Sequence, residues 1–286
     1  MPIDYPAVLN LKTDSAPYSW GDREVMLYAL GIGMGSDPLN EKELQFVNET
    51  FAVPKPLKVV PTFASVCVWG ARPGVIDLNR VLLVDGERDI TFHKPIPVIA
   101  RVTADARVRG VYDKGKGKGA IIQNEIIVRD CDGEKIVTIT SSTFARGDGG
   151  FGGPSKGEGE PHQVPRRAPD RSIDIPIRAD QSLIYRLSGD RNPLHSDPEF
   201  ARRGGFPRPI LHGMCTYGLT CRAVLQTYAD YDPCAFRRHR ARFSAPVFPG
   251  ETITINLWKD GNSISFEGHV RERQVTVVKN GQTVLG

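Results

Sequence analysis

Residues 185–195 read YRLSGDRNPLH and residues 209–218 read PILHGMCTYG, and these two stretches decide how the rest of the chain is interpreted. The first stretch places a carboxylate, an amide and an imidazole within six residues, at Asp190, Asn192 and His195. Its Ser-Gly and Asn-Pro pairs interrupt both helix and strand, so we expect these polar groups on an irregular loop. Catalytic and binding residues are often found on loops of this kind.

An Asp and a His held close together can bracket one water molecule. One group takes a proton from the water while the other gives a proton to the substrate, and each transfer contributes about 10²- to 10⁴-fold in rate. Asn192 can orient the water or one of the two partners. The alternative is that Asp190 and Asn192 only cap a turn through hydrogen bonds to the backbone.

The second stretch predicts the start of a helix. Apolar residues recur at helical spacing through this segment, at Ile210, Met214, Cys221, Leu225 and Tyr228. His212 and Gly213 then lie at the helix N-terminus, where free backbone N–H groups are suited to hold a developing oxyanion. Losing one such donor costs about 10²- to 10³-fold in rate.

The pattern Tyr-x-Leu-Ser-Gly-Asp-x-Asn-Pro-Leu-His over residues 185–195 resembles the signature of the hydratase 2 family, the MaoC-like (R)-specific enoyl-CoA hydratases. The resemblance implies that Asp190 and His195 are the catalytic pair and that Asn192 supports them by hydrogen bonding. It also implies that the amide of Gly213 binds the thioester oxygen.

The same resemblance implies contacts with an acyl-CoA substrate. The residues concerned are Asp85, Gly86, Lys114, Arg191, Pro193, Leu194, His212 and Phe243. Two of them have a plainer interpretation, because the DKGKGKG turn that holds Lys114 could be solvated and Phe243 could be a core aromatic residue. No metal or redox cofactor is expected, since the thioester itself activates the alkene.

Composition sets the broad class. The 286 residues are 40% hydrophobic and 24% charged, which suits one large or two medium domains. No apolar run approaches the roughly 18 residues of a membrane helix. The sequence offers neither a signal peptide nor a C-terminal Ser-Lys-Leu, so a cytoplasmic location is expected. A net charge of +4 does not argue for nucleic acid. Five cysteines without a C-x-x-C motif suggest neither disulfides nor a zinc site.

Local amino-acid composition divides the chain into three parts. Residues 1–146 contain segments rich in Val, Ile and Thr that predict successive strands, including 90–100, 102–112, 120–130 and 135–144. Residues 147–172 are dense in Gly and Pro and predict a linker. Residues 173–286 contain the helix described above and further strands. Asp260-Gly261 and Asn280-Gly281 predict hairpin turns there.

The two outer parts repeat each other. Tyr28 matches Tyr185, the block at 61–70 matches 209–218, and Phe92 matches Phe243, at offsets of 157, 148 and 151. These offsets imply an internal duplication. We expect an α+β fold in which two antiparallel sheets each wrap a central helix, the double hot-dog architecture of the family that the chain resembles.

Only the second copy retains the reactive groups. The first copy reads GIGMGSDPLN where the second has its Asp and His, and Ala64-Ser65 replaces His212-Gly213. The first half should therefore be non-catalytic, and the resemblance implies that it accommodates the acyl chain.

The expected activity is reversible syn hydration of trans-2-enoyl-CoA to (R)-3-hydroxyacyl-CoA in fatty acid metabolism, by a homodimer as in the family. A hot-dog acyl-CoA thioesterase and a non-catalytic acyl-thioester-binding module are the alternatives. The sequence leaves open the acyl chain length and branching, the choice between CoA and acyl carrier protein, the pathway, and which of Asp190 and His195 is the base.

Overall fold

The computed structural model describes residues 3–50, 56–76, 78, 82–157 and 160–286. The strands are β1 (Lys12–Trp20), β2 (Leu83–Phe92), β3 (Ala100–Asp113), β4 (Ala120–Arg129), β5 (Lys135–Ala145), β6 (Arg171–Pro176), β7 (Phe236–Phe243), β8 (Thr252–Asp260), β9 (Ser263–Val270) and β10 (Val275–Leu285). The α-helices are α1 (Asp22–Gly31), α2 (Glu41–Leu44), α3 (Gln181–Tyr185), α4 (Pro198–Arg203) and α5 (Gly213–Tyr228). Short 3-10 helices are η1 (Ala7–Asn10), η2 (Pro61–Ser65), η4 (Arg186–Ser188), η5 (Pro193–His195), η6 (Pro233–Ala235) and η7 (Arg271–Arg273).

Alternating side chains explain the long N-terminal strands. In β3, buried residues alternate with more exposed ones along most of the strand, so one face of the sheet turns toward the core. The predicted strands at 102–112, 120–130 and 135–144 are confirmed as β3, β4 and β5. The strand predicted at 90–100 is instead β2, which ends at Phe92. Pro95 and Pro97 follow, and a proline has no N–H to continue a ladder.

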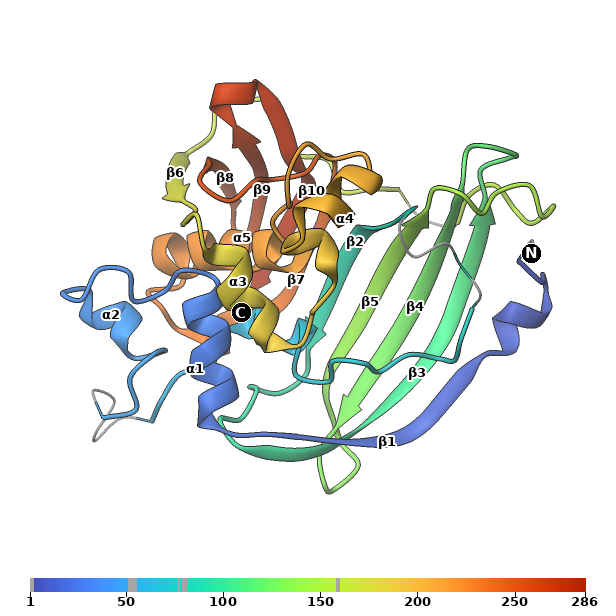
Figure 1. Ribbon diagram of the computed structural model, residues 1–286. Coiled ribbons are helices and arrows are strands. Elements are labelled where there is room, and N and C mark those ends of the chain that lie inside the picture. Colours follow the sequence, from blue (N-terminus) through green and yellow to red (C-terminus); the bar gives the residue numbers. More distant parts are fainter. Residues whose placement is uncertain (1–2, 51–55, 77, 79–81, 158–159) are drawn as a thin grey trace.

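The two halves share one sheet rather than forming two separate ones. The ten strands follow the order β1-β3-β4-β5-β2-β7-β10-β9-β8-β6, and β2 pairs with β7 across the junction (Figure 1). In that pairing Asp89 lies opposite Arg240, its own equivalent at the offset of 151. A residue that meets its own copy marks a local two-fold axis, as in an isologous dimer contact. Joining the edges in this way also removes two exposed strand edges.

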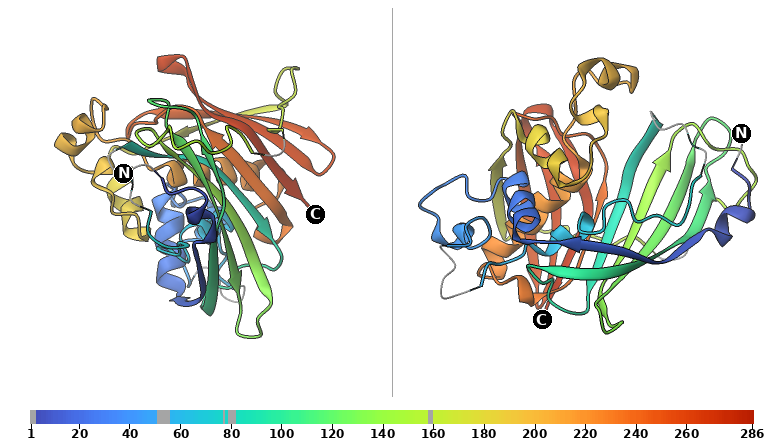
Figure 2. Two further views of the ribbon diagram at one scale, coloured as in Figure 1. Left: turned by 90° about the vertical axis from the view of Figure 1, so that its right-hand side faces the viewer. Right: turned by 60° about the horizontal axis from the view of Figure 1, so that its bottom comes forward.

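Helix α5 is the central helix of the C-terminal half. Eleven of its sixteen residues are buried, and the strands from β7 to β10 curve around it (Figures 1 and 2). The prediction of an equivalent α-helix in the N-terminal half is wrong for the described residues. The matching block forms only η2 and further turns, and Gly70 (φ +94°) ends it.

One of the two predicted hairpin turns is confirmed. Asp260-Gly261 joins β8 to β9, but Asn280-Gly281 lies inside β10 as a bulge rather than a turn. Asn280 has φ +55°, and a Cβ at Gly281 would lie 2.2 Å from the Phe266 ring. The pair therefore kinks the strand where Phe266 packs against its backbone.

The linker is tied to the N-terminal half. Apart from the start of β6, its described residues form no helix or strand, yet the Asp113 carboxylate accepts hydrogen bonds from the amides of Gly115, Gly150 and Gly152 at 2.7 to 2.8 Å. These bonds lower the pKa of Asp113. They also hold the start of the linker against the β3–β4 turn that carries Lys114.

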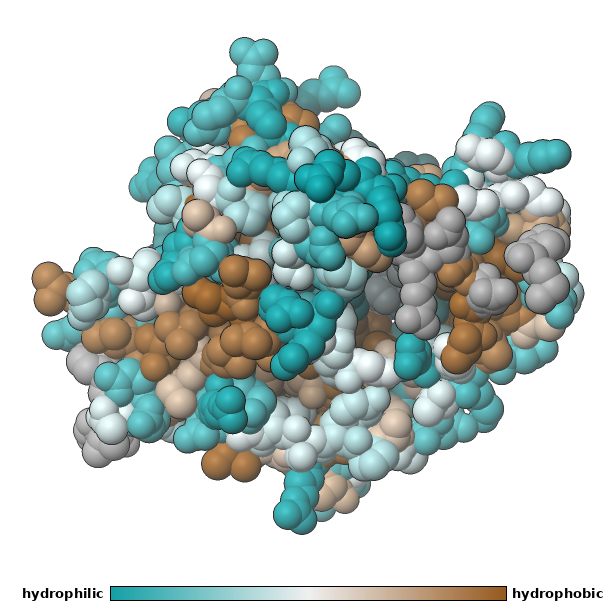
Figure 3. All heavy atoms as spheres, viewed as in Figure 1, coloured by the Kyte–Doolittle hydropathy of each residue, from teal (hydrophilic) through white to brown (hydrophobic). Residues whose placement is uncertain are grey.

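Apolar side chains gather on the surface over α1 and α3 (Figure 3). Leu30, Leu183 and Leu187 are each more than two-fifths exposed there. Below them the equivalent residues Tyr28 and Tyr185 pack edge to face, with ring centroids 5.9 Å apart. Within the part of the chain that the structure describes, no helix combines the length and apolar character needed to cross a bilayer.

Candidate active site

A cavity of about 700 Å³ lies between the two halves. Predicted site residues that line it are Asp85, Gly86, Lys114, Asp190, Asn192, Leu194, His195, Gly213 and Phe243. Three predicted substrate contacts do not line it. Arg191 and Pro193 are exposed to solvent, and His212 is completely buried behind His195.

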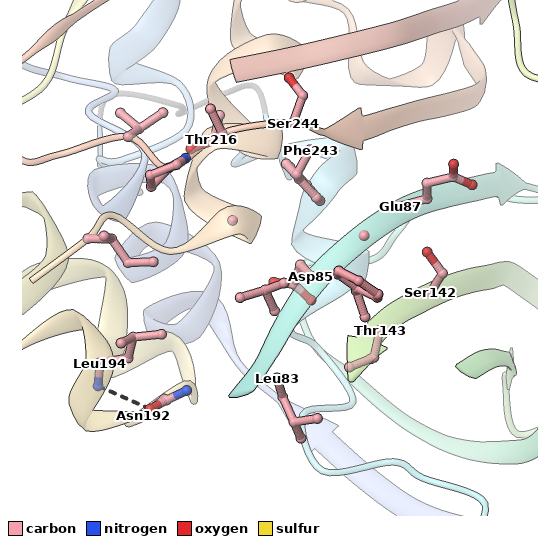
Figure 4. Close-up of a pocket in the computed structure, with 18 of the residues that line it drawn as sticks. Leu83, Asp85, Glu87, Ser142, Thr143, Asn192, Leu194, Thr216, Phe243 and Ser244 are labelled. Atoms are coloured by element: carbon pink, nitrogen blue, oxygen red, sulfur yellow. Dashed lines mark hydrogen bonds between the residues drawn. The ribbon is translucent and has the colours of Figure 1, made fainter. Parts of the chain in front are cut away.

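The catalytic loop is organised by its own side chains. The backbone N–H of Asn192 donates to Asp190 Oδ1, and the backbone N–H of Leu194 donates to Asn192 Oδ1, each at 3.1 Å (Figure 4 shows the second bond). Asp190 and Asn192 therefore do cap the turn. However, capping occupies only Oδ1 of Asp190, which leaves Oδ2 to face His195.

His195 is held by the segment before α5. Its Nδ1 donates to the carbonyl of Ile210 at 2.9 Å, which leaves Nε2 as an acceptor in the neutral ring. Nε2 lies 3.9 Å from Asp190 Oδ2, too far for a direct hydrogen bond. One water molecule can bridge two atoms at this separation, with a hydrogen bond to each.

Burial changes the charge states of the pair. The side chains of Asp190 and His195 are only 19% and 9% exposed. Desolvation disfavours the charged form of each group, so it raises the pKa of Asp190 and lowers the pKa of His195. The pair is thereby biased toward a protonated carboxyl group and a neutral imidazole.

Gly213 is the first residue of α5, so its amide is one of the unpaired N–H groups of that helix. The carboxylate of Asp85, which Figure 4 shows on β2 of the other half, lies beside it. A Cβ on Gly213 would lie 2.9 Å from Asp85 Oδ2, which explains why this position holds glycine. The site therefore needs both halves, although both members of the pair come from one.

The acid and the two imidazoles form a cluster that invites comparison with a metal site. Ligand atoms of Asp190, His195 and His212 lie within 4.8 Å of one another. The two rings stack, however, with centroids 3.8 Å apart and 27° between their planes. Nearly parallel rings direct their in-plane lone pairs side by side rather than toward one point, so the cluster does not fit the convergent geometry of a metal centre.

Sequence reasoning missed a contact from the N-terminal half. Gly189 adopts φ +127° directly before Asp190, and a Cβ there would lie 2.6 Å from Trp69 Cγ. Trp69 also lines the cavity. Trp69 lies near the end of the duplicated block at 61–70, and this position is the sequence signal that indicates a place at the interface between the halves.

These features define a class: a duplicated hot-dog protein with an acid–imidazole pair beside a helix N-terminus. Residues 18–147 match the model described as MFE-2 hydratase 2 N-terminal domain, and residues 161–281 match the MaoC like domain.

Full-length relatives agree with this class. The chain is 40% identical to enoyl-CoA hydratase ChsH3 of Mycobacterium tuberculosis, over 98% of both chains. It is 36% identical to the peroxisomal enoyl-CoA hydratase 2 of Arabidopsis thaliana, over 98% of this chain and 94% of that protein. The crystal structure of a MaoC-like dehydratase from Phytophthora capsici superposes with a TM-score of 0.85 at 29% identity, covering 98% and 96% of the two chains. The chain belongs to the MaoC-like dehydratase family, in its hydratase 2 branch, and the double hot-dog expectation is confirmed.

Proposed function

We propose that this protein adds one water molecule to the C2=C3 bond of a trans-2-enoyl-CoA through Asp190 and His195, giving an (R)-3-hydroxyacyl-CoA. The enzyme is a hydro-lyase of fatty acid metabolism, in keeping with relatives named enoyl-CoA hydratase 2 and 3-hydroxyacyl-thioester dehydratase. The observation that carries the mechanism is the 3.9 Å gap between Asp190 Oδ2 and His195 Nε2, open to the cavity beside Gly213.

The hydrogen bond to Ile210 supports His195 as the base. Its Nε2 takes one proton from the water as the water oxygen bonds to C3, and the protonated carboxyl group of Asp190 gives a proton to C2. The imidazolium then returns its proton to the Asp190 carboxylate, so the pair regains its starting state and the elements of one water molecule have been added. Both groups lie on the same side of the alkene, which gives syn addition. Dehydration is the reverse sequence.

The start of α5 supports the thioester. Negative charge develops on the thioester oxygen as water attacks C3, and the Gly213 amide with the positive end of the helix dipole stabilises it. This stabilisation applies to the transition state more than to the neutral substrate, so it accelerates the reaction.

The cavity suggests how the substrate is held. Asp85, Gly86, Lys114 and Phe243 line it and remain our proposed contacts for the carrier. Apolar side chains from the N-terminal half, including Leu83, Ile121 and Phe144, line the same cavity and suit an acyl chain. This supports a non-catalytic N-terminal half that accommodates the acyl group.

A homodimer and a cytoplasmic location stay predictions. The apolar surface formed by Leu30, Leu183 and Leu187 is a suitable dimer contact. Sedimentation of the wild type and of Leu183→Asp tests this, since a dimer that uses the surface becomes monomeric on substitution. Cell fractionation tests the location.

Incubation with trans-2-enoyl-CoAs of graded length tests the reaction. The expected result is loss of the conjugated enoyl thioester and formation of the (R)-alcohol without release of thiol. Thiol release from saturated acyl-CoA would instead indicate a thioesterase. Tight acyl-CoA binding without turnover would indicate a binding module.

A further inference from the structure

His212 is placed unlike a substrate contact. It is 0% exposed, and it is enclosed between the ring of Tyr185, with centroids 4.9 Å apart, and the ring of His195, at 3.8 Å. Since no part of it reaches the cavity, a thioester cannot touch it. Whatever His212 contributes to the reaction must pass through its neighbours.

One of those connections leads to the acid. His212 Nε2 donates to the backbone carbonyl of Asp190 at 3.1 Å, so it ties the catalytic loop to the residue before α5. Within that loop only short-range hydrogen bonds fix Asp190, and Gly189 before it has an unusual backbone conformation. The bond from His212 is therefore a long-range restraint on where the carboxyl group sits.

A second connection leads to the base. The ring of His212 stacks on the His195 imidazole and so limits the tilt of that imidazole. The carbonyl of Ile210 holds the imidazole at Nδ1. A third connection is covalent, since the peptide after His212 carries the Gly213 amide. Residues 210–213 thus fix all three groups of the proposed mechanism.

We infer that His212 is a positioning residue, which sets the distance between Asp190 and His195 through its hydrogen bond and its stacked ring. The inference rests on the proposed roles of that pair. His212 stays neutral, because burial lowers its pKa to about 2 and its Nδ1 finds no hydrogen-bond acceptor among the residues that the structure describes. A neutral ring can lie against His195 without opposing the positive charge that His195 gains during turnover.

Two substitutions separate the two contacts. His212→Phe keeps a flat ring but removes the donor to Asp190, whereas His212→Gln keeps a donor near the position of Nε2 but removes the ring. We expect His212→Phe to lower kcat by about 10- to 100-fold, by analogy with residues that orient metal-binding side chains. KM for an enoyl-CoA should change less than about twofold, since His212 does not touch the substrate. His212→Gln should regain part of the loss in kcat.

The pH dependence of kcat/KM distinguishes a positioning role from a merely structural one, because loss of stability alone would leave the pH limbs unchanged. Without its restraint the catalytic loop relaxes toward water, so the limb governed by Asp190 should shift to lower pH in His212→Phe. The titratable groups that act on the pair are Asp85 from β2, Tyr185 from α3 and His212 itself, and Arg186 from η4 lies near His212. All except His212 are unchanged in the variant.

His239→Phe is the matched control. His239 is equally buried and forms hydrogen bonds with the side chains of Thr220 and Thr283. It does not contact Asp190 or His195. It should reduce thermal stability and leave kcat and the pH limbs in place. The inference is overturned if His212→Phe keeps normal kcat, or if its losses in kcat and stability match those of His239→Phe. If Asp190→Asn and His195→Gln are inactive in the same assay, such a result rejects the role of His212 alone. If those two variants are active, the proposed pair itself has failed.

Discussion

The two halves put buried carboxylates to different uses. In the C-terminal half, Asp190 has no ion-pair partner among the described residues nearer than the edge of His195, 3.9 Å away, and its pKa is raised. In the N-terminal half, Glu43 of α2 follows the GIGMGSDPLN segment, accepts from the amide of Gly35 within that segment and forms a two-pronged ion pair with Arg222 of α5. A buried carboxylate whose two oxygens both accept hydrogen bonds stabilises the fold. A carboxylate with one oxygen free in a cavity can instead exchange protons.

The largest expected effect comes from removing the proton-exchanging groups. Asp190→Asn and His195→Gln should each lower kcat by about 10²- to 10⁴-fold, because each removes one proton transfer. The melting temperature should change little, since neither side chain forms a close ion pair. Asp37→Asn in the N-terminal copy is the control, because Asp37 only caps the amide of Leu39. Near-normal turnover in either catalytic variant would refute the assignment.

The next effect concerns the other carboxylate. Glu43→Gln should lower the free energy of unfolding by about 3 to 5 kcal/mol, because Arg222 is left buried without its partner. Urea denaturation measures this, with exposed Glu41→Gln on the same helix as the control. kcat of the folded variant should be unchanged. A stability equal to that of the control would mean that the ion pair does not hold this loop.

A smaller effect is expected at the carrier contact of the N-terminal half. Lys114→Ala should raise KM for an enoyl-CoA by about tenfold without changing kcat, since a phosphate contact far from C3 binds substrate and transition state equally. Lys118 lies in the same turn but is exposed and does not line the cavity. Lys118→Ala should therefore leave KM in place. Equal effects of the two variants would favour a solvated turn.

The smallest effect tests whether a charge in the N-terminal half shifts the pKa values of the catalytic pair. kcat/KM should fall at low pH as His195 gains a proton and at high pH as Asp190 loses one. The negative charge of Asp85 raises the pKa of both groups, so Asp85→Asn should move both limbs to lower pH by roughly half a unit. Glu87→Gln, two residues along β2, should move neither limb. A profile that only rises to a plateau at high pH would mean that Asp190 acts in its ionised form.

The sequence predicted the parts of this structure that depend on short-range signals. The loop at 185–195, the start of α5 at Gly213 and most of the strands follow from turn residues, helical spacing and alternation. The duplication was also readable, and the pairing of Asp89 with Arg240 reproduces one of its offsets.

What the sequence could not predict depends on contacts between distant segments. The stacking of His212 on His195 and the approach of Trp69 to Gly189 join residues that no local pattern relates. The block after Pro61 is similar in sequence to the start of α5 but forms no α-helix, so similarity between the copies does not imply the same local structure. The bulge at Asn280-Gly281 has the same dipeptide as a hairpin turn, and only the Phe266 ring against it decides between the two.

The pairing of β2 with β7 has a consequence for how this enzyme can diversify. The acid and the imidazole come from one copy of the duplication, while much of the cavity wall that we propose to hold the acyl group comes from the other. Apart from Asp85 and Trp69, which contact the start of α5 and the catalytic loop, mutations in the second set can accumulate without disturbing proton transfer. Exchanging N-terminal halves that keep these two residues should therefore transfer substrate preference between relatives and leave the stereochemical outcome unchanged.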